Sequence, residues 1–490
     1  MPTDAPKEPK AMPEHQPLRV AVIGAGPAGI YAADILCKSD PGATVDIFDR
    51  LPTPYGLIRY GVAPDHPRIK GIINSLHHVM SNPRITFHGN VHVGVDISIG
   101  ELREFFDAII VATGAERDRH VELPGMDLPG SHGAAEFVSF YDAHPDREQA
   151  WDLTGASSVA VIGVGNVALD VSRILARTGD ELLYTEIPPH VHAALKTSAV
   201  TDVHMFARRG PAQAKFTPVE LRDIDRSPNV QAVVDPAGME FDEASEKALK
   251  GSKSLRMVVD VLSEWALREP TPGPHRRIHI HFLQNPVAVL GDDHVTGLRT
   301  ERQELSGDGT AHGTGEFTDW EVQAVYRAVG YRSEPVDGLP WDATSNVLPN
   351  VAGRVLDGGQ RVPGLYATGW VKRGPVGLIG STKSDAAETV ANLLADAPRL
   401  RRAPRRDRQA VLDHLAAKGL ELTDFTGWDR LDAHERSLGR AATAAGASLP
   451  RERIKVISRT EMTTIARADP TTFRGDPNAF RADTTGRRDG

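Results

Sequence analysis

Short apolar runs alternate with glycine turns and helix-length segments in two places along the chain. In residues 17–50, the apolar run LRVAVIG is followed by a glycine-rich turn, by the helix-like segment IYAADILCK and by a second apolar run, VDIFD. Such an order indicates a strand–turn–helix–strand unit. Residues 155–210 repeat it with SSVAVIG, LDVSRILAR and VHMFARR. The repetition predicts an α/β protein with two Rossmann-like, three-layer domains.

The patterns between and after these units predict the remaining elements. Residues 178–198 form an insertion between the helix and the last strand of the second unit. Residues 235–267 predict mainly helix, because the apolar positions of SLRMVVDVLSEWAL recur at helical spacing, and the alternating segments between 276 and 331 predict strands. The apolar run GLYATGW at 364–370 predicts one more buried strand, followed by a glycine loop and a helix.

Composition and charge exclude several classes of protein. Hydrophobic residues make up 40% of the chain, charged residues make up 25%, and the formal charge is −9, so no global positive charge favours nucleic acid or anionic lipid. No apolar run approaches the ~20 residues that span a bilayer, and residues 1–16 lack the apolar core of a secretory signal. We expect a cytoplasmic protein with disordered ends at 1–16 and 468–490, and a solvated basic linker at 399–408.

The chain has a single cysteine, Cys37. One thiol excludes a disulfide framework within the chain, a C-x-x-C redox centre and a resident iron–sulfur cluster, which typically needs four thiolates. Cys37 falls on the apolar face of a predicted helix and is expected to be a buried structural thiol. No metal site is expected.

Each strand–turn–helix unit carries a glycine fingerprint. The first is formed by Gly24, Gly26 and Gly29, and the second is GVGNVA, residues 163–168. Between a strand and a helix, this spacing lets the backbone approach a pyrophosphate, and the helix N-terminus offers unpaired N–H groups and partial positive charge to it. A glycine turn that only packs a helix on a sheet is the alternative for either copy, and two copies in context favour dinucleotide binding.

The second strands of the two units end in opposite charges. Asp49 ends the first, and a carboxylate there accepts hydrogen bonds from a free ribose 2′-hydroxyl, which suits FAD or NAD. Arg208 and Arg209 end the second, and two guanidinium groups suit the 2′-phosphate of NADP(H). The alternative for the two arginines is a solvated strand end.

Five longer segments, taken together, carry a family resemblance. They are LPTPYGLIRYGVAPDHPRIK (51–70), GVGNVALDVSRIL (163–175), RRGPAQAKFTPVELR (208–222), AVGYRS (328–333) and GWVKRGPVGLIGSTKSDA (369–386). In this order they resemble adrenodoxin-reductase-type ferredoxin–NADP reductases, including the actinobacterial members, from about residue 17 to 460. The resemblance implies an FAD-binding domain made of residues 17–117 and 335–467, with an NADP-binding domain, 118–334, inserted between them.

The resemblance also implies which residues contact the cofactors. For FAD they are Gly24, Gly26, Pro27, Ala28, Gly29, Asp49, Leu57, Val91, Trp370, Gly377, Leu378 and Ile379. For NADP(H) they are Arg119, Val164, Gly165, Asn166, Val167, Arg208, Arg209 and Glu220, with Trp370 and Gly377 beside the nicotinamide. A core tryptophan is the alternative for Trp370, and a solvated helix acid is the alternative for Glu220.

His66 lies in the proline-rich segment GVAPDHP, where a turn histidine that caps backbone groups is one interpretation. The resemblance instead implies a place near flavin and NADP(H), where a titratable group tunes hydride or proton movement. Asp170 and Asp223 are the candidate carboxylate partners of His66. The actinobacterial relatives tend to have the longer Glu at the position of Asp223, which leaves a direct role for Asp223 open.

The implied activity is transfer of electrons from NADPH, through FAD, one at a time to a separate ferredoxin-type iron–sulfur protein, by a protein expected to be monomeric. Lys250, Lys253 and Arg256 lie on one predicted helix and are candidates for a basic docking patch, with a solvated helix face as the alternative. The alternative functions are a flavin-dependent NADPH monooxygenase or diaphorase and a non-catalytic NADP-binding sensor. A disulfide oxidoreductase lacks the cysteines it needs.

Overall fold

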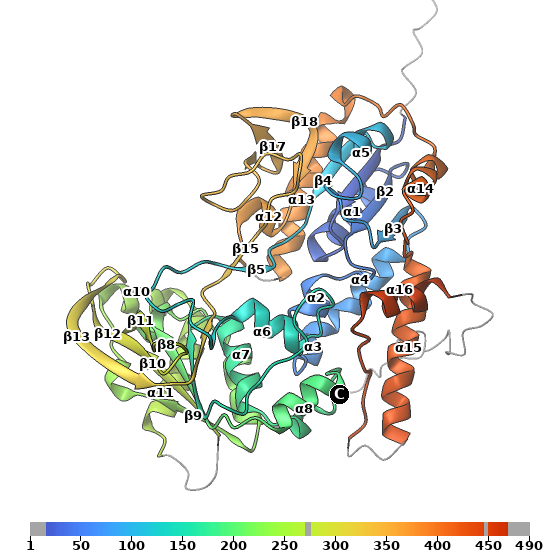
Figure 1. Ribbon diagram of the computed structural model, residues 1–490. Helices are drawn as coiled ribbons and strands as arrows, with labels where there is room; N and C mark the ends of the chain where they lie inside the picture. The colour runs from blue at the N-terminus through green and yellow to red at the C-terminus, as the bar shows by residue number, and fades with distance from the viewer. Residues whose placement is uncertain (1–15, 270–275, 378, 445–448, 469–490) are drawn as a thin grey trace, which may run out of the picture. The chain divides into compact units, whose positions relative to one another are not determined.

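The chain forms two compact units, each with its own parallel sheet (Figure 1). The computed structural model describes residues 16–269, 276–377, 379–444 and 449–468. The first unit contains the chain up to Thr53, Asn74–Gly114 and Pro335–Phe425, and the second contains Pro54–Ile73, Ala115–Glu334 and the chain from Thr426 on. The predicted fold class, two dinucleotide-binding α/β domains with one inserted in the other, is confirmed. The predicted disordered ends lie outside the described residues except for Gln16 and Ala468.

Two segments group differently from the domain boundaries that the sequence suggests. Residues 54–73 and the chain from Thr426 on are expected in the FAD-binding domain, yet their contacts are with the second unit. Assignment of the two units to two cofactors stays a prediction at this point.

The first unit is built on a seven-stranded sheet with the order β16-β17-β18-β4-β1-β2-β3. Strands β18, β4, β1, β2 and β3 run parallel, and β16 and β17 form an antiparallel extension. Its strands are β1 (Arg19–Ile23), β2 (Thr44–Asp49), β3 (Ile85–Gly89), β4 (Ala108–Val111), β16 (Asn350–Val351), β17 (Arg354–Asp357) and β18 (Gln360–Ala367). Its helices are α1 (Pro27–Ser39), most of α4 (Ile72–Met80), α5 (Ile99–Phe105), α12 (Trp370–Arg373), α13 (Ile379–Asp396), η5 (Ala397–Arg399) and α14 (Arg408–Ala417).

Helices cover both faces of this sheet, as Figure 1 shows for α1, α13 and α5. On one face, α1 packs against α13, and Cys37 of α1 is buried as expected, which raises the pKa of its thiol. On the other face, Leu102 of α5 and Val411 of α14 join the core formed by Ile109 of β4 and its neighbours. A sheet covered on both faces explains why its central strands read as nearly continuous apolar runs.

The second unit is built on a six-stranded, wholly parallel sheet with the order β6-β14-β7-β8-β10-β9. The strands of the parallel sheet are β6 (Ser131–Gly133), β7 (Ser158–Ile162), β8 (Asp202–Ala207), β9 (Val230–Val234), β10 (Arg276–Phe282) and β14 (Ala324–Arg327). The unit also contains β5 (Arg117–Asp118), which pairs with β15 (Tyr331–Arg332), and the strands β11 (Gln284–Leu290), β12 (Gly297–Leu305) and β13 (Ala311–Glu321). Its helices are α2 (Leu57–Tyr60), α3 (Pro67–Lys70), α6 (Ala134–Tyr141), α7 (Asn166–Ala176), η1 (Asp180–Leu182), α8 (Pro189–Lys196), η2 (Pro211–Gln213), α9 (Pro218–Arg222), η3 (Ile224–Arg226), η4 (Pro236–Gly238), α10 (Glu243–Gly251), α11 (Lys253–Leu267), α15 (Phe425–Ala444) and α16 (Arg459–Arg467).

The two faces of this parallel sheet are covered differently. Helices α6, α7, α8 and α11 bury one face, with Val203 and Ile278 among the strand residues in that core. The antiparallel sheet β11-β12-β13 covers the other, where Leu298 of β12 packs with Phe206 of β8 and Val325 of β14. The predicted insertion contains η1 and α8, and the predicted helical and strand segments at 235–267 and 276–331 are present.

Buried ion pairs hold the C-terminal segment on the second unit. The guanidinium of Arg59 in α2 donates two hydrogen bonds to the carboxylate of Glu435 in α15, at 2.5 and 3.0 Å, and both side chains are buried. The ammonium of Lys455 donates to the carbonyl oxygens of Arg59 and Asp142 and lies 2.9 Å from the carboxylate of Glu186. These contacts explain why residues 54–73 and the chain from Thr426 on belong to the second unit.

Three histidines stack on the face of the parallel sheet that β11-β12-β13 covers. His204 of β8 lies between His279 and His281 of β10, with ring centroids 4.5 and 5.3 Å apart. Trp320 of β13 contacts His281, at a centroid distance of 4.4 Å. Burial, together with a smaller effect of the neighbouring histidines, lowers the pKa of His204 to about 4 and that of His281 to about 3.

The basic segment 399–408, expected to be a solvated linker, is partly a structural anchor. The carboxylate of Asp107, at the start of β4, is fully buried and pairs with Arg402 and Arg406. It also accepts hydrogen bonds from the backbone N–H groups of Arg19 and Ala403. The expectation fails because one buried carboxylate outside the segment recruits two of its arginines.

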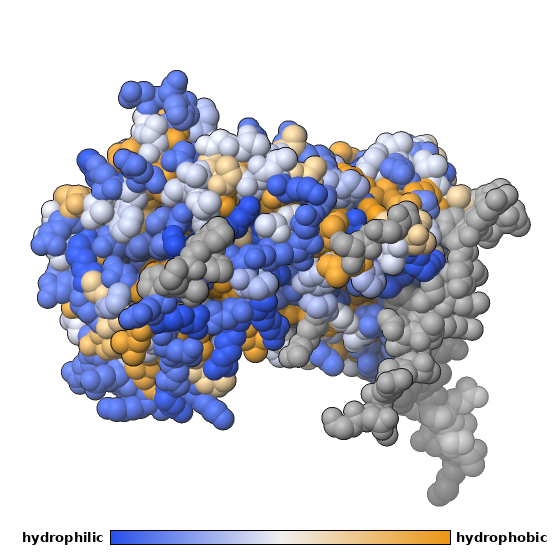
Figure 2. Space-filling view, turned by 90° about the horizontal axis from the view of Figure 1, so that it is seen from below, coloured by the Kyte–Doolittle hydropathy of each residue, from blue (hydrophilic) through white to orange (hydrophobic). Residues whose placement is uncertain are grey.

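In the part of the chain that the structure describes, no helix is long and apolar enough to cross a bilayer. On the face seen in Figure 2, hydrophilic residues predominate and apolar residues form small separate groups.

Replacing Glu435 with Ala will leave the guanidinium of Arg59 buried without its carboxylate. We expect a loss of about 3–5 kcal/mol in the free energy of unfolding, measured by urea denaturation. Glu246→Ala is the control, because Glu246 forms an exposed pair with Lys250 in the same unit and is expected to change stability by about 0.5 kcal/mol or less. Equal effects of the two substitutions would contradict this account of the C-terminal segment.

The histidine stack predicts a loss of stability on acidification. Unfolded histidine takes up a proton near pH 6.5, whereas folded His204 and His281 stay neutral down to about pH 4 and 3. The stabilisation is therefore complete above pH 6.5 and falls as the pH drops, by about 1.4 kcal/mol per pH unit for each histidine. Urea denaturation between pH 7 and 5 should show a shallower decline for His281→Phe than for the wild type. The exposed His294→Phe is the control and should leave the slope unchanged.

Candidate functional site

The glycine turn of the first unit connects β1 to α1 in a conformation that only small residues allow. Gly24 has a φ of +109°, and a Cβ atom there would lie 2.4 Å from the carbonyl oxygen of Ala112. A Cβ atom at Gly29 would lie 2.1 Å from the carbonyl oxygen of Gly24. At Gly26, which precedes α1, a Cβ atom would meet nothing within 4 Å. The outer glycines are therefore required by packing, and the middle one faces open space at a helix N-terminus, which fits a dinucleotide pyrophosphate.

Backbone donors hold Asp49 at the end of β2. Its Oδ2 accepts a hydrogen bond from the backbone N–H of Ala25 at 2.7 Å, and its Oδ1 accepts one from Leu51 at 2.9 Å. Buried Val91 lies beside it, with its N–H donating to the carbonyl oxygen of Asp49. The carboxylate is thus fixed next to the glycine turn, at the carboxyl edge of the sheet where α/β folds bind nucleotides.

The segment around Trp370 reaches the same edge. Gly369, with a φ of +76°, packs so closely on α1 that a Cβ atom would lie 2.7 Å from the Cβ of Ala28. Asp385 of α13 accepts hydrogen bonds from the N–H of Gly369 and the hydroxyl of Thr368. Half-buried Trp370 begins α12 directly afterwards. The structure therefore brings Gly24–Gly29, Asp49, Val91 and Trp370 together on the first unit.

Three further residues implied for FAD follow Trp370, and one lies elsewhere. Gly377 has a φ of +89°, which favours glycine. Leu378 lies outside the described residues, and Ile379 begins α13. Leu57 lies in α2, which belongs to the second unit. The contacts of these four residues with FAD stay predictions.

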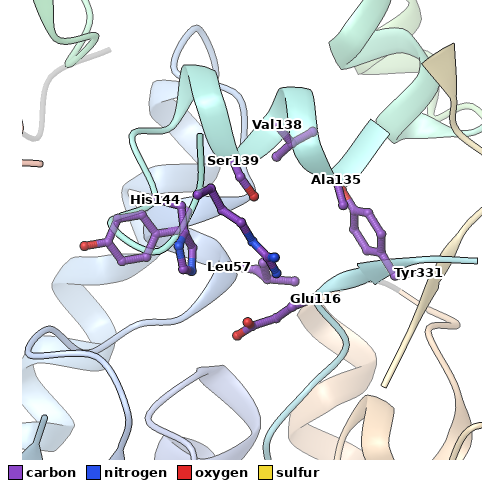
Figure 3. A pocket seen from close by; sticks show the side chains of 9 residues that line it. Leu57, Glu116, Ala135, Val138, Ser139, His144 and Tyr331 are labelled. Atoms are coloured by element: carbon purple, nitrogen blue, oxygen red, sulfur yellow. The ribbon is translucent and has the colours of Figure 1, made fainter. Parts of the chain in front are cut away.

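In the second unit, Leu57 lines a cavity of about 10 Å³, room for about one water molecule. Figure 3 shows Val138 and Ser139 of α6 above this cavity and Leu57 and Glu116 below it, with Tyr331 to one side. Burial raises the pKa of Tyr331, so its hydroxyl stays protonated. The cavity is too small for a cofactor ring, and the residues that line it pack α2 against α6.

The second glycine turn, between β7 and α7, repeats the geometry of the first. Gly163 has a φ of +134°, and a Cβ atom there would lie 2.4 Å from the carbonyl oxygen of Ala328. Gly165 faces open space, as Gly26 does, and Ala168 is fully buried. As in the first unit, the N-terminus of the helix faces an open space that a side chain in place of the middle glycine would occupy.

The segment that follows Arg209 folds back on this turn. The N–H of Lys215 donates to the carbonyl oxygen of Val164 at 2.9 Å, and the N–H of Thr217 donates to the side-chain oxygen of Asn166 at 3.0 Å. Val164 and Val167 pack at the border of the core. Exposed Lys215, which sequence reasoning did not single out, is thereby placed beside Gly165.

Arg208 and Arg209 come directly after β8, which pairs in parallel with β7. The carboxyl ends of parallel neighbours meet at one edge, so the arginines lie on the same edge as the glycine turn. Within the described ranges, no carboxylate lies within 4 Å of either guanidinium, and Arg208 is exposed. Two cations at this edge that no described carboxylate neutralises fit the 2′-phosphate of NADP(H).

Glu220 and Arg119 have different surroundings. Buried Glu220 accepts a hydrogen bond from the hydroxyl of Thr217 at 2.8 Å. Burial raises the pKa of Glu220, and the nearby charge of Asp170 raises it further. Arg119 is exposed at the end of β5, and its N–H donates to the carbonyl oxygen of Gly330. Their roles toward NADP(H) stay predictions.

His66 lies in a buried cluster of charged groups in the second unit. Its Nε2 lies 2.9 Å from Oδ1 of Asp170 and 2.7 Å from Nη2 of Arg173, and its Nδ1 lies 3.4 Å from Oδ2 of Asp223. All three predicted members, His66, Asp170 and Asp223, are therefore together. The alternative of a turn histidine that caps backbone groups is wrong, because His66, although it precedes α3, makes no capping hydrogen bond with its side chain and contacts charged side chains instead.

Arg173, which the sequence analysis missed, organises this cluster. Its guanidinium donates to both carboxylate oxygens of Asp65, at 2.6 and 2.9 Å, and to Asp170 at 2.7 Å. Burial alone would raise the pKa of Asp65, but the charges of Arg173 and Arg177 hold it well below its usual range. The signal was present in the sequence, because Asp170 and Arg173 are three residues apart on one helix and therefore share a face.

The surroundings of His66 admit both of its charge states. A guanidinium only donates, so the Nε2 of neutral His66 accepts from Arg173 and its proton sits on Nδ1, toward Asp223. In the protonated ring, Nε2–H donates to Asp170 and Nδ1–H points at Asp223. Protonation therefore turns Nε2 from an acceptor for Arg173, 2.7 Å away, into a donor to Asp170, so the contact between Nε2 and Arg173 has to lengthen.

The candidate docking residues Lys250, Lys253 and Arg256 do not share one helix. Ser252 ends α10 and caps α11 by accepting from the N–H of Leu255, so the prediction of a single helix is wrong. Arg256 donates to the carbonyl oxygens of Leu249 and Lys250 at the end of α10. The three side chains are therefore not equivalent, and a docking role stays a prediction.

Comparisons with known proteins agree with this arrangement. The profile of a family described as pyridine nucleotide-disulphide oxidoreductase matches residues 18–210. The NADPH-ferredoxin reductase FprA of Mycobacterium tuberculosis is 41% identical over 463 residues, which cover 91% of this chain and 98% of the relative. The mitochondrial NADPH:adrenodoxin oxidoreductase of Arabidopsis thaliana is 39% identical over 442 residues, which cover 86% and 92%.

The chain belongs to the family of NADPH-ferredoxin and NADPH:adrenodoxin reductases. A solved structure described as Mycobacterium tuberculosis FprA in complex with NADPH matches with a TM-score of 0.85 at 40% identity, over 92% of this chain and all of that one. The resemblance drawn from the five sequence segments is thereby confirmed. Which residues touch each cofactor stays a prediction.

Replacing Arg208 and Arg209 together with Ala will weaken NADPH binding and leave NADH binding nearly unchanged. Each charge-assisted hydrogen bond to the 2′-phosphate contributes about 1.5–3 kcal/mol, so the Kd for NADPH should rise at least tenfold. Isothermal titration with NADPH and NADH measures both affinities. Lys247→Ala, at an exposed position of α10, is the control. An equal loss of affinity for the two nucleotides would show that the arginines do not recognise the phosphate.

Proposed function

We propose that the protein is an FAD-dependent reductase that takes electrons from NADPH and passes them singly to a separate ferredoxin-type iron–sulfur protein. One observation carries the proposal. Two glycine turns of the same geometry stand beside opposite charges, with Asp49 at the first and Arg208 and Arg209 at the second. One unit thus suits a nucleotide with a free ribose, and the other suits a nucleotide with a phosphorylated ribose.

The residues of each unit take distinct tasks. In the first, Asp49 accepts from the ribose of FAD, the N-terminus of α1 faces its pyrophosphate, and Trp370 supports the flavin ring. In the second, the N-terminus of α7 faces the pyrophosphate of NADPH, and Arg208 and Arg209 bind its 2′-phosphate. Bound FAD supplies the chemistry, which is acceptance of two electrons as a hydride and their release one at a time.

His66, Asp170 and Asp223 hold or release a proton during this chemistry. The cluster is buried, and His66 has hydrogen-bond partners for either charge state. A histidine in such surroundings responds to the arrival of negative charge by taking up a proton. The prediction that these three residues are catalytic thereby gains a specific task, which is to hold or release a proton.

The electron acceptor is a separate chain. The sequence has one cysteine, and a resident iron–sulfur cluster typically needs four thiolates. The names of the relatives, ferredoxin and adrenodoxin reductases, support an iron–sulfur protein as partner. A monomeric state and a cytoplasmic location remain predictions from the sequence.

Stopped-flow reduction of the FAD-loaded protein tests the function. We expect NADPH to bleach the flavin absorbance at least tenfold faster than NADH at equal concentration, because only NADPH engages both arginines. Cytochrome c reduction should then depend on added ferredoxin. Fast NADPH oxidation that requires a small organic substrate and oxygen would indicate a monooxygenase instead. Protein that stays colourless after addition of FAD would indicate a non-catalytic NADP sensor.

A further inference from the structure

A cavity of about 280 Å³ lies beside the His66 cluster in the second unit. Its walls include two carboxylates of the cluster, those of Asp65 and Asp223, together with Arg177 and Arg226. The volume is several times the roughly 30 Å³ that one water molecule occupies in the liquid. With a wall of charged side chains, such a space takes up water, so solvent reaches Asp223 from this side.

The two oxygens of Asp223 face in different directions. Oδ2 lies 3.4 Å from Nδ1 of His66, and Oδ1 lies 2.6 Å from Nη1 of Arg226. The side chain of Asp223 is 9% exposed, whereas that of Arg226 is 67% exposed. Asp223 thus connects a buried histidine to a cation at the wall of the cavity.

Nothing else described in the chain holds the carboxylate of Asp223. Its only cationic neighbours within 4 Å in the described ranges are His66 and Arg226, and Oδ1 receives no well-aligned hydrogen bond. A carboxylate is far better hydrated in water than in a protein interior, so it tends to turn toward water unless a charge holds it. The ion pair with Arg226 is the contact that opposes this rotation.

We propose that Arg226 is a positioning residue that holds Asp223 against His66, and that the cavity beside them is the route by which His66 exchanges protons with solvent. This inference rests on the proposed function, in which His66 holds or releases a proton. The proton moves between solvent in the cavity, the carboxylate of Asp223 and Nδ1 of His66, and no electron moves with it.

The charges around His66 come from several elements. Helix α7 supplies Asp170 and Arg173, the end of α9 supplies Asp223, and the preceding residue of the loop is Asp65. Arg226 of η3 faces Asp223, Arg177 faces Asp65, and Glu220 of α9 interacts with His66 through its charge. Three guanidinium groups thus face Asp65, Asp170 and Asp223, with Glu220 as a fourth carboxyl group, so the state of His66 depends on how closely each approaches the ring.

The direction in which the titration midpoint of His66 moves in an Arg226 variant distinguishes two effects. Arg226 either positions Asp223 or acts on His66 only through its own positive charge. In Arg226→Gln, release of Asp223 toward the cavity removes a carboxylate from His66, which moves the midpoint of its titration to lower pH. If Asp223 stayed in place, loss of the positive charge would move that midpoint to higher pH. Hydrogen–deuterium exchange at the C2 position of His66, followed by mass spectrometry across a pH series, measures the midpoint in the purified holoenzyme.

We expect Arg226→Gln to lower the midpoint by about one pH unit, in the same direction as Asp223→Asn, and Arg226→Lys to restore most of the difference. Arg222→Gln is the matched control. It removes an exposed arginine from α9, close in sequence, that has no ion pair within the described residues, and it should leave the midpoint unchanged. A midpoint that is unmoved or raised in Arg226→Gln would overturn the proposal.

The exchange measurement needs neither NADPH nor ferredoxin, so it judges the inference even where the proposed activity is absent. Where the activity is present, the pH profile of flavin reduction by NADPH gives a second readout. The part of this pH profile that reflects the titration of His66 should shift in Arg226→Gln by the same amount as the exchange midpoint. Arg226→Lys should reverse the shift. A profile identical to that of the wild type would also contradict the proposal.

Discussion

The close approach of one glycine to a neighbouring backbone sets the geometry of both units. Gly24 lies so near Ala112, and Gly163 so near Ala328, that a side chain at either glycine would overlap a carbonyl oxygen. This contact brings the start of a helix to the carboxyl edge of a parallel sheet, where its unpaired N–H groups face outward. All other parts of the two nucleotide cradles are positioned relative to that edge.

Charge then distinguishes two cradles that the backbone makes alike. At the first, Asp49 is held by two backbone N–H groups, so its carboxylate is fixed at the edge where the proposed function places the ribose of FAD. At the second, Arg208 and Arg209 follow β8 without a carboxylate partner in the described ranges, and the proposed function assigns them the 2′-phosphate of NADPH.

The sequence was sufficient for the elements that depend on local pattern. Apolar runs, glycine spacing and strand-end charges predicted both βαβ units and a dinucleotide site in each. The resemblance carried by the five longer segments implied the inserted arrangement and named His66, Asp170 and Asp223 before the structure brought them together. The contact grouping of residues 54–73 was not predictable in this way. It depends on Arg59 meeting Glu435 across 376 positions of sequence, and no periodic pattern encodes such a pairing.

The same limitation applies to single charged groups. Asp107 draws Arg402 and Arg406 out of a basic run that otherwise reads as solvated, and Ser252 divides a helical pattern that reads as continuous. In each case a single side chain determines the local structure, which therefore differs from the one that the composition of the segment predicts. Arg173 is a further example, because the spacing from Asp170 was visible while its second partner, Asp65, comes from a different loop.

The buried cluster around His66 shows why these charges are tolerated in the interior. An isolated buried charge is strongly destabilising, and here each carboxylate has a guanidinium partner: Asp65 with Arg173 and Arg177, Asp170 with Arg173, and Asp223 with Arg226. Since these pairs balance one another, addition or removal of one proton at His66 changes the net charge of the whole cluster by one.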